Sequence, residues 1–398
     1  MKPRIFIAMH YMELGGAESA LLGLLQAHDP KKADIDLFLY DHVGELMQYI
    51  PTSVFLMPKI EVYSMLERPI YELLRKGYWG VALGRTLASF FAKQEKKNNK
   101  ENLDDISVYY YIAKFVNPFL PKINPSLEYD LAISFLQPHL YVLQKVSARK
   151  KLAWLHTDYS KVFVSVKEEA VWSQYNYIAA ISEEVGHSFV KRFPNLNSKI
   201  IPIENILSSK FIRERANEFE NDLPGSGFRL LTIGRYSYPK KLEDIPLLTV
   251  KIQNAFPDLK WYIIGYGNPI EEKKIQDNIS KEGVQDSVVL LGKQTNPYPF
   301  IKACDVYVQP SRYEGKSITV REAQILCKPV IVTAYPTAPS QIQDGVDGVI
   351  VPLDIEQCAK SIISFLKDIE KQVKIVNYLS EHDYGNENEI NKIYQLAK

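Results

Sequence analysis

The 398-residue sequence lacks the marks of a secreted, disulfide-rich protein and of a nucleic-acid-binding protein. Its three cysteines, Cys304, Cys327 and Cys358, are an odd number without metal-ligand spacing, so we expect reduced thiols in a cytoplasmic protein. Its 48 basic and 47 acidic residues leave a formal net charge of +1, whereas a general nucleic-acid binder normally has a clear basic excess. The composition therefore predicts no disulfide framework and no nucleic-acid partner.

Long hydrophobic runs are absent as well. No segment approaches the roughly 18 consecutive apolar residues that a membrane-spanning helix needs. The apolar run near the start of the sequence, Ile5–Met9, is interrupted by His10 and is too short for the core of a signal peptide. We interpret that run as a first β-strand.

Short, nearly continuous apolar runs do recur along the chain, as expected for strands that are covered on both faces. Amphipathic segments lie between most of these runs, and the alternation predicts parallel sheets flanked by helices. The expected strands are 4–9, 35–40, 53–57, 129–135, 151–155, 177–181 and 199–203 in one series, and 228–234, 260–265, 288–292, 305–310, 329–335 and 348–352 in the other.

A turn-rich stretch at 221–227, NDLPGSG, separates the two series of strands. We therefore predict two domains, 1–222 and 223–398, with a helical insertion at about 59–127 in the first and a helical tail from about 357 in the second. The predicted fold class is α/β, with two Rossmann-like domains facing each other across a cleft. Folds of this kind bind ligands at the carboxyl ends of their strands.

Charge is uneven in one window, from Lys59 to Lys100. The window holds nine basic and four acidic residues, and its aromatic and aliphatic residues recur at steps of three and four, which indicates amphipathic helices. One interpretation is a solvated helix face. The other is a surface that contacts anionic lipid headgroups.

The strongest local signal is the segment 312–326, RYEGKSITVREAQIL, which follows an expected strand. Gly315 permits a tight turn there, and a helix is expected to start near Ser317 or Thr319. The free N–H groups of that helix N-terminus would bind an anionic diphosphate. Glu314 lies in the loop before the helix, where a carboxylate usually faces a site.

Three more charged residues are candidates in the second domain. Arg235 and Lys240 follow its first strand in the segment 230–241, LLTIGRYSYPKK, and their cations suit a diphosphate. The alternative is two surface cations in a loop. Glu322 is either a further site residue or the partner of Thr319 in a helix-capping box.

The first domain offers weaker candidates. Gly15 and Gly16 follow the first strand and open a helix, which lets backbone amides approach a phosphate or a sugar. His156 ends another strand, although a lone histidine is more often structural. The chain has no Walker-type loop, no HExxH, no Asp-x-Asp pair at a strand end and no GxSxG motif, so chemistry on a diphosphate-linked donor would proceed without a protein-bound metal.

Together these features resemble the retaining glycosyltransferases of the GT-B fold, and specifically glycosyltransferase family 4, the group 1 glycosyl transferases. The resemblance rests on the Gly-Gly turn, His156, the GRxxxxK pattern at 234–240, and Glu314-Gly followed by Glu322. It covers essentially the whole chain and is densest from Leu230 to Pro352.

The resemblance implies an acceptor-binding first domain and a nucleotide-sugar-binding second domain. It implies catalytic roles for Arg235 and Lys240 at the diphosphate, for Glu314 at the donor sugar and for His156 beside the reacting carbon. Glu322 would bind the ribose hydroxyls. The other residues that it assigns to substrate binding are Gly15, Gly16, Gly292, Lys293, Gly315, Lys316, Ser317, Ile318 and Thr319.

Two positions depart from the family pattern. Lys241 stands where the family usually has glycine, so Lys240 and Lys241 could exchange roles, and Lys316 stands where it usually has phenylalanine. Lys316 and the Tyr-Pro-Thr at 335–337 resemble members that build bacterial capsular polysaccharide or exopolysaccharide.

The expected reaction is transfer of a sugar from a UDP-linked donor to a hydroxyl of a glycan or polyprenyl-linked acceptor, with retention and without a cofactor or metal. The attack is expected on the same face that the leaving phosphate departs from. A lipid-linked acceptor would bring the cytoplasmic enzyme to the inner face of the cell membrane. The alternatives are a GT-B sugar-nucleotide epimerase and a catalytically silent subunit that binds nucleotide sugar.

Overall fold

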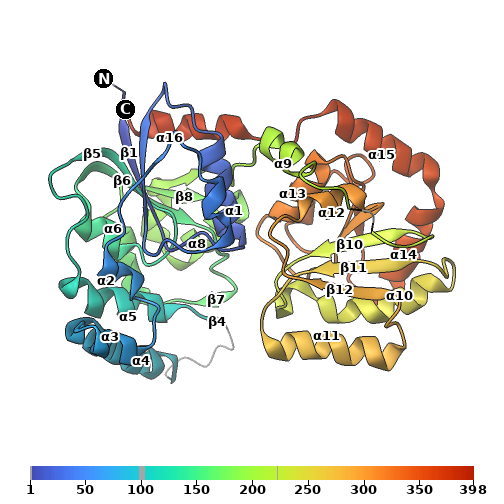
Figure 1. Ribbon diagram of the computed structural model, residues 1–398, viewed down its shortest axis with the longest axis horizontal. Helices are drawn as coiled ribbons and strands as arrows, with labels where there is room; N and C mark the ends of the chain where they lie inside the picture. The colour runs from blue at the N-terminus through green and yellow to red at the C-terminus, as the bar shows by residue number, and fades with distance from the viewer. Residues whose placement is uncertain (1, 98–103, 222) are drawn as a thin grey trace. The chain divides into compact units, whose positions relative to one another are not determined.

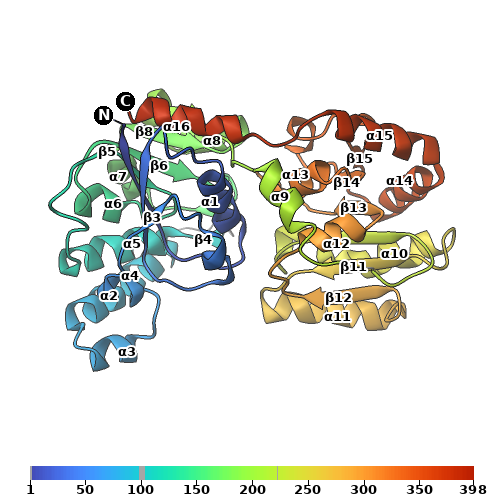
Figure 2. The same ribbon diagram turned by 45° about the horizontal axis from the view of Figure 1, so that its top comes forward.

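The computed structural model describes residues 2–97, 104–221 and 223–398. The chain divides into two compact units, one of Met1–Ile206 with Glu387–Lys398 and one of Leu207–Asn386. Each unit is an α/β structure with one large sheet (Figures 1 and 2). Three residues named in the predictions lie outside the described residues, namely Met1, Lys100 and Asp222.

The first unit is built on a seven-stranded sheet in the order β3-β2-β1-β5-β6-β8-β9, with every neighbouring pair parallel. The order reverses between β1 and β5, and sheets of this kind bind ligands at such a reversal. Its strands are β1 (Arg4–Met9), β2 (Asp34–Leu39), β3 (Phe55–Leu56), β5 (Tyr129–Ser134), β6 (Ala148–Leu155), β8 (Tyr177–Ala180) and β9 (Ile200–Pro202).

The described part of the region predicted as a helical insertion, residues 59–97 and 104–127, contains four α-helices. Two short strands, β4 (Asp104–Asp105) and β7 (Val162–Phe163), pair with each other outside the main sheet and are too short to leave a sequence pattern. The helices of the first unit are α1 (Gly16–Gln26), α2 (Glu61–Ser64), α3 (Ile70–Arg75), α4 (Trp79–Lys97), α5 (Ser107–Val116), α6 (Leu140–Lys145), α7 (Glu169–Trp172), α8 (Glu183–Arg192) and α16 (Ile390–Leu396).

The second unit has a six-stranded parallel sheet in the order β12-β11-β10-β13-β14-β15. Its strands are β10 (Arg229–Ile233), β11 (Lys260–Ile264), β12 (Val288–Gly292), β13 (Val306–Gln309), β14 (Val330–Thr333) and β15 (Val349–Val351). Its helices are α9 (Ser209–Arg215), α10 (Ile245–Gln253), α11 (Pro269–Glu282), α12 (Tyr298–Ala303), α13 (Ile318–Ile325), α14 (Ile355–Lys367) and α15 (Ile369–Glu381). Every strand of both predicted series is present.

Helices cover both faces of this second sheet, which explains why the sequences of its strands are continuous apolar runs. Leu230 and Trp261 lie in an apolar cluster with residues of α10 and α14. The next residues along the same strands, Leu231 and Tyr262, lie in another cluster with residues of α12 and α13. Alternate residues of a strand point to opposite faces, so each face has its own layer of helices.

The division of the chain differs from the predicted limit between residues 222 and 223. Leu207, Ile212 and Ala216 are buried in the apolar cluster with α12 and α13, so this stretch belongs to the second unit. The final helix, α16, belongs to the first unit. Residues 221 and 223–227 of the turn-rich stretch therefore lie in a loop of the second unit, between α9 and β10.

Tyr394 attaches α16 to the first unit. Its hydroxyl lies 3.0 Å from Nδ1 of His28 and accepts a hydrogen bond of 2.9 Å from the backbone N–H of Asp29. The final helix thus closes against the turn between α1 and β2, far from it in sequence (Figure 1).

We expect Tyr394→Phe to lower the free energy of unfolding by about 1–2 kcal/mol, because it leaves the buried ring of His28 and the partly buried N–H of Asp29 without their partner. Urea unfolding of the full chain measures the change, with amide exchange across α16 reporting local opening. Tyr71→Phe is the control, because Tyr71 is 67% exposed and its hydroxyl bonds only to the neighbouring Glu72 among the contacts described. Equal losses in the two variants would contradict the attachment.

Candidate functional site

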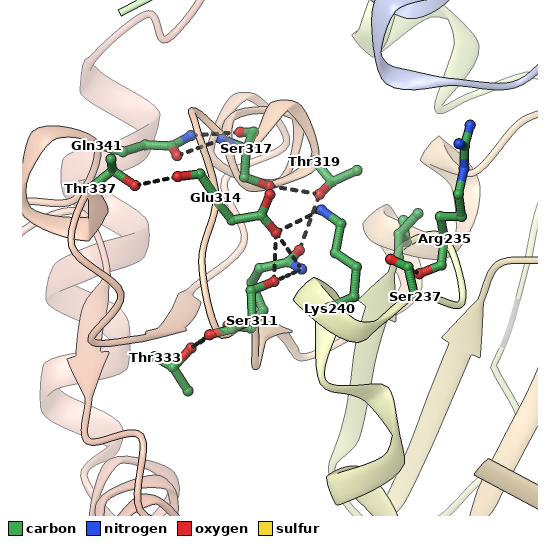
Figure 3. Close-up of polar contacts among 12 residues, drawn as sticks. Arg235, Ser237, Lys240, Ser311, Glu314, Ser317, Thr319, Thr333, Thr337 and Gln341 are labelled. Carbon is green, nitrogen blue, oxygen red and sulfur yellow. Dashed lines mark hydrogen bonds and ion pairs between the residues drawn. The ribbon is translucent and has the colours of Figure 1, made fainter. Parts of the chain in front are cut away.

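The main group of candidate residues lies at the carboxyl edge of the six-stranded sheet, where β10 and β13 are neighbours. Lys240 follows β10 and Glu314 follows β13. Nζ of Lys240 donates to Oε1 of Glu314 at 2.6 Å (Figure 3), and the two side chains are only 22% and 12% exposed. The structure therefore joins two residues 74 positions apart in an ion pair that is largely removed from water.

Neighbouring polar residues hold Glu314 in place. Oγ of Ser311 donates to the same Oε1 at 2.6 Å, and Nε2 of Gln309 lies 3.4 Å from it. The backbone carbonyl of Glu314 accepts a bond of 2.9 Å from Oγ1 of Thr337. Because both the carboxylate and the backbone are bonded, the side chain is positioned before any ligand arrives.

The N-terminus of α13 lies beside this ion pair (Figure 3). The helix begins at Ile318 after Ser317, as predicted, and Gln341 bonds both the N–H and the carbonyl of Ser317, at 3.0 and 2.6 Å. No side chain caps the helix. Its first-turn N–H groups are therefore not used by a cap and, with the helix dipole, favour an anion there.

Glu322 lies in α13 but faces α12. It is 4% exposed, and its Oε1 accepts a bond of 2.9 Å from the hydroxyl of Tyr298. Burial raises the pKa of Glu322 to about 7. The capping-box alternative with Thr319 is wrong, because Ser317 occupies the N-cap position and Oγ1 of Thr319 donates to Gln309 instead.

Arg235 and Lys241 differ in their surroundings from Lys240. Arg235 is exposed, and its guanidinium is directed away from the Lys240–Glu314 pair (Figure 3). Lys241 adopts a left-handed backbone with φ of 56°, and its Nζ contacts the carbonyl of Leu353 at 2.8 Å and Asp244 at 3.0 Å. Only Lys240 of these three cations pairs with Glu314. The left-handed φ also gives a reason for a glycine at position 241 in the family pattern.

Gly292 and Lys293 lie at the end of β12, on the same sheet edge. The carbonyl of Gly292 accepts a bond of 3.0 Å from the N–H of Gly265, which follows β11. Nζ of Lys293 lies 4.8 Å from the centroid of the Tyr266 ring. These residues form a separate group at the end of β11 and β12, and no contact places them against Glu314 among the contacts described.

The remaining candidates belong to the first unit. Gly15 is the N-cap of α1 and Gly16 its first residue, and a Cβ on Gly15 would lie 2.1 Å from a side-chain oxygen of Glu18. His156 follows β6, with its ring centroid 4.7 Å from that of Phe135. Burial lowers the pKa of His156 to about 4, so the imidazole is neutral at pH 7.

Sequence reasoning missed a polar cluster at the carboxyl edge of the first sheet. Nε2 of Gln137 donates to the hydroxyl of Tyr159 at 2.8 Å and to Glu168 at 3.1 Å. Burial raises the pKa of Glu168 to about 8. Sequence reasoning also missed Gln309 and Gln341 in the second unit. Gln309 had a detectable signal, because it is a polar residue that interrupts the apolar run of β13 at its end.

Within residues 2–97, 104–221 and 223–398, no group of three or more His, Cys, Asp or Glu residues is arranged to hold a metal ion. In the same part of the chain, no helix is both long and apolar enough to cross a membrane.

Comparison with known families and proteins gives consistent results for this chain. Residues 213–382 match the family described as "Glycosyl transferases group 1". An uncharacterized glycosyltransferase of Methanocaldococcus jannaschii is 26% identical over 249 residues, which are 58% of this chain and 60% of that protein. The UDP-Gal:alpha-D-GlcNAc-diphosphoundecaprenol alpha-1,3-galactosyltransferase of Escherichia coli is 26% identical over 130 residues, 32% of each chain. The match thus spans less than two thirds of either relative.

A solved structure of HepE from Anabaena, in complex with UDP and glucose, superposes with a TM-score of 0.66 and 15% identity, covering 99% of this chain and 98% of that one. The fold is GT-B, and the resemblance to the group 1 glycosyl transferases is confirmed.

The raised pKa of Glu322 leads to a pH-dependent stability. Because burial favours the neutral carboxyl, its contribution to stability is complete below about pH 4.5 and is lost as the pH rises through about 7. We expect Glu322→Gln to remove this pH-dependent contribution to the free energy of unfolding, which amounts to up to about 3 kcal/mol. Urea unfolding between these pH values measures it, with Glu214→Gln on the exposed face of α9 as the control. Parallel pH profiles for the wild type and Glu322→Gln would contradict the assignment.

Proposed function

We propose that this chain, whose residues 213–382 match the group 1 glycosyl transferases, moves a sugar from a UDP-linked donor to a hydroxyl of a glycan or polyprenyl-linked oligosaccharide. The observation that carries the proposal is the Lys240–Glu314 ion pair beside the uncapped N-terminus of α13. HepE, whose structure contains UDP and glucose, supports the donor class. The printed name of the Escherichia coli relative supports a diphosphoundecaprenol-linked acceptor.

In this proposal the second unit binds the donor. An ammonium group has three N–H donors, and one of those on Lys240 bonds Glu314, so the others are available to phosphate oxygens. The N–H groups of α13 bind the same diphosphate, and Glu314 binds hydroxyls of the donor sugar. Glu322 binds the ribose hydroxyls, while Arg235 and Lys293 approach the nucleotide by side-chain movement from their exposed positions.

The transfer proceeds with retention on one face of the sugar. The bond between the anomeric carbon and the phosphate oxygen breaks, and the acceptor oxygen forms a bond to that carbon from the same face. The departing phosphate oxygen takes the proton of the acceptor hydroxyl, so the products are a glycoside and UDP. Lys240 and the α13 dipole stabilise the charge on the phosphate, and the step uses no metal or cofactor.

The first unit binds the acceptor at the carboxyl edge of its sheet, near Gly15, Gly16 and His156. The neutral imidazole of His156 is able to accept or donate a hydrogen bond to a sugar hydroxyl without adding charge. With a polyprenyl-linked acceptor, as in bacterial capsular or exopolysaccharide synthesis, the enzyme works in the cytoplasm at the inner face of the cell membrane.

Two adjacent lysines provide a matched test of the donor site. We expect Lys240→Met to lower the rate of UDP release by about 10²–10³-fold, because it removes a charge from the departing phosphate. Lys241→Met should stay within about threefold of wild type, because Nζ of Lys241 is held by the carbonyl of Leu353 and by Asp244 and does not contact Glu314. The donor is first chosen by thermal stabilisation across a panel of nucleotide sugars. Similar losses in both variants would contradict the role of Lys240.

Retention is tested on the product. We expect the anomeric configuration of the donor to be kept, as read from the anomeric proton coupling by NMR, with the rate unchanged by EDTA. An inverted product would overturn the same-face mechanism. Conversion of the nucleotide sugar without an acceptor would indicate the epimerase, and stabilisation by nucleotide sugar without any turnover would indicate the silent subunit.

A further inference from the structure

The helix α4 has an apolar stripe on its solvent side. Trp79, Leu83, Leu87 and Phe90 are 67%, 57%, 38% and 62% exposed. Their spacing of four, four and three residues puts them on one face, over a length of about 17 Å at 1.5 Å per residue. Large apolar side chains exposed in a row are unusual on a soluble surface and mark an interaction site.

This stripe is distinct from the face by which α4 packs. Ala88 and Ala92 are buried, and a Cβ on Gly84 would lie 2.7 Å from the carbonyl of Phe115 in α5. Phe91 stacks on the ring of Phe115 at 5.2 Å, whereas its neighbour Phe90 projects outward. The core therefore buries one side of α4, whereas the apolar residues on the other side stay largely exposed in the described part of the chain.

Neighbouring elements enlarge the stripe. The helix α3 contacts α4 and exposes Tyr71 (67%) and Leu74 (38%). Phe119 is 50% exposed, and its ring lies against Gly80 in the first turn of α4. Both views show α3 and α4 together at one end of the first unit (Figures 1 and 2). We call Tyr71, Leu74, Trp79, Leu83, Leu87, Phe90 and Phe119 the α3–α4 patch.

The charges around the α3–α4 patch are one-sided. Three of the four acidic residues in the window have a described partner outside the patch: Glu61 pairs with Lys76 at 2.7 Å, Glu67 with His10 at 2.9 Å, and Glu95 accepts a bond from Ser165 at 3.0 Å. The fourth, Glu72, accepts a bond of 3.2 Å from the hydroxyl of Tyr71. Within the described part of the basic window, residues 59–97, the exposed cations for which no ion pair is described are Arg75, Lys93, Lys96 and Lys97. The patch is therefore bordered by uncompensated positive charge.

We propose that the α3–α4 patch docks on an anionic membrane surface, with its aromatic and aliphatic side chains inserted at the headgroup level and its lysines on the phosphates. Aromatic residues and basic side chains with long apolar stems favour that interface. A second copy of the chain fits less well, because two such patches would bring like charges together. This inference rests on the proposed function, in which the polyprenyl-linked acceptor lies in the membrane on which the patch docks.

The test is co-sedimentation with vesicles of phosphatidylcholine, with and without phosphatidylglycerol. We expect binding to require phosphatidylglycerol and to fall with salt, because exposed charges are screened. Leu83→Ser with Leu87→Ser should lower the partition coefficient at least about tenfold, since each loses apolar burial in the interface. Lys96→Gln with Lys97→Gln should lower it about 10–30-fold, which is about three- to fivefold for each charge.

Two matched controls come from the second unit. Ile369 and Val373 are an exposed pair four residues apart on α15, at 57% and 51%, and Lys360 and Lys367 are exposed on α14. Ile369→Ser with Val373→Ser and Lys360→Gln with Lys367→Gln should bind vesicles like wild type. Thermal stabilisation by UDP should be unchanged in all four double variants, which shows that they are folded.

Binding that ignores phosphatidylglycerol and salt, or equal losses in the controls, would overturn the proposal. So would self-association in sedimentation velocity that Leu83→Ser with Leu87→Ser abolishes, because the patch would then bind a second copy. Failure of the proposed function can be distinguished from failure of the docking proposal. A chain that binds anionic vesicles but releases no UDP from any UDP-sugar supports the patch and refutes the transferase.

Discussion

The ion pair between Lys240 and Glu314 is the interaction on which the candidate site depends. It joins the loops after β10 and β13, which are adjacent in the sheet although 74 residues separate the two side chains in sequence. That adjacency exists because the chain winds outward to β12 and then returns beside β10, so that parallel strands bring both loops to one edge. With Ser311 and Thr337 bonded to Glu314, the N-terminus of α13 is fixed beside a cation. A diphosphate site therefore follows from the topology together with a few polar bonds.

The buried carboxyl groups of this protein differ in their bonding partners. Glu314 has Lys240 as a partner, whereas Glu322 and Glu168 bond neutral groups and have pKa values raised to about 7 and about 8. Without a cation at hydrogen-bond distance, desolvation favours the protonated form. A ribose hydroxyl that donates to Glu322 would favour its ionised form, so in the proposed donor complex nucleotide binding and proton release are linked at this residue.

Much of the architecture could be predicted from sequence because buried parallel strands have a strong signal. The apolar runs at all the strands of both sheets are continuous, as required when helices cover both faces. Lys240 and Glu314 were recognisable for a related reason, since charged residues after such strands must lie at the carboxyl edge. The direction of Arg235 could not be predicted, because an exposed side chain is not constrained by its backbone position. The domain limit was misplaced because Gly and Pro mark a turn, whereas the packing of α9 decides which unit a segment joins.

The near-zero net charge of the chain conceals how the charges are distributed. In the first unit, Glu61 pairs with Lys76 and Glu67 with His10. The exposed lysines of α4 therefore have no described acidic partner, and they form a positively charged helix surface. At the candidate site of the second unit, Lys240 is balanced by the carboxylate of Glu314. The sequence total cannot distinguish these situations, because pairing depends on which residues the fold brings within a few ångströms. The electrostatic properties of this protein are therefore local and are set by the charges at each sheet edge and each helix face.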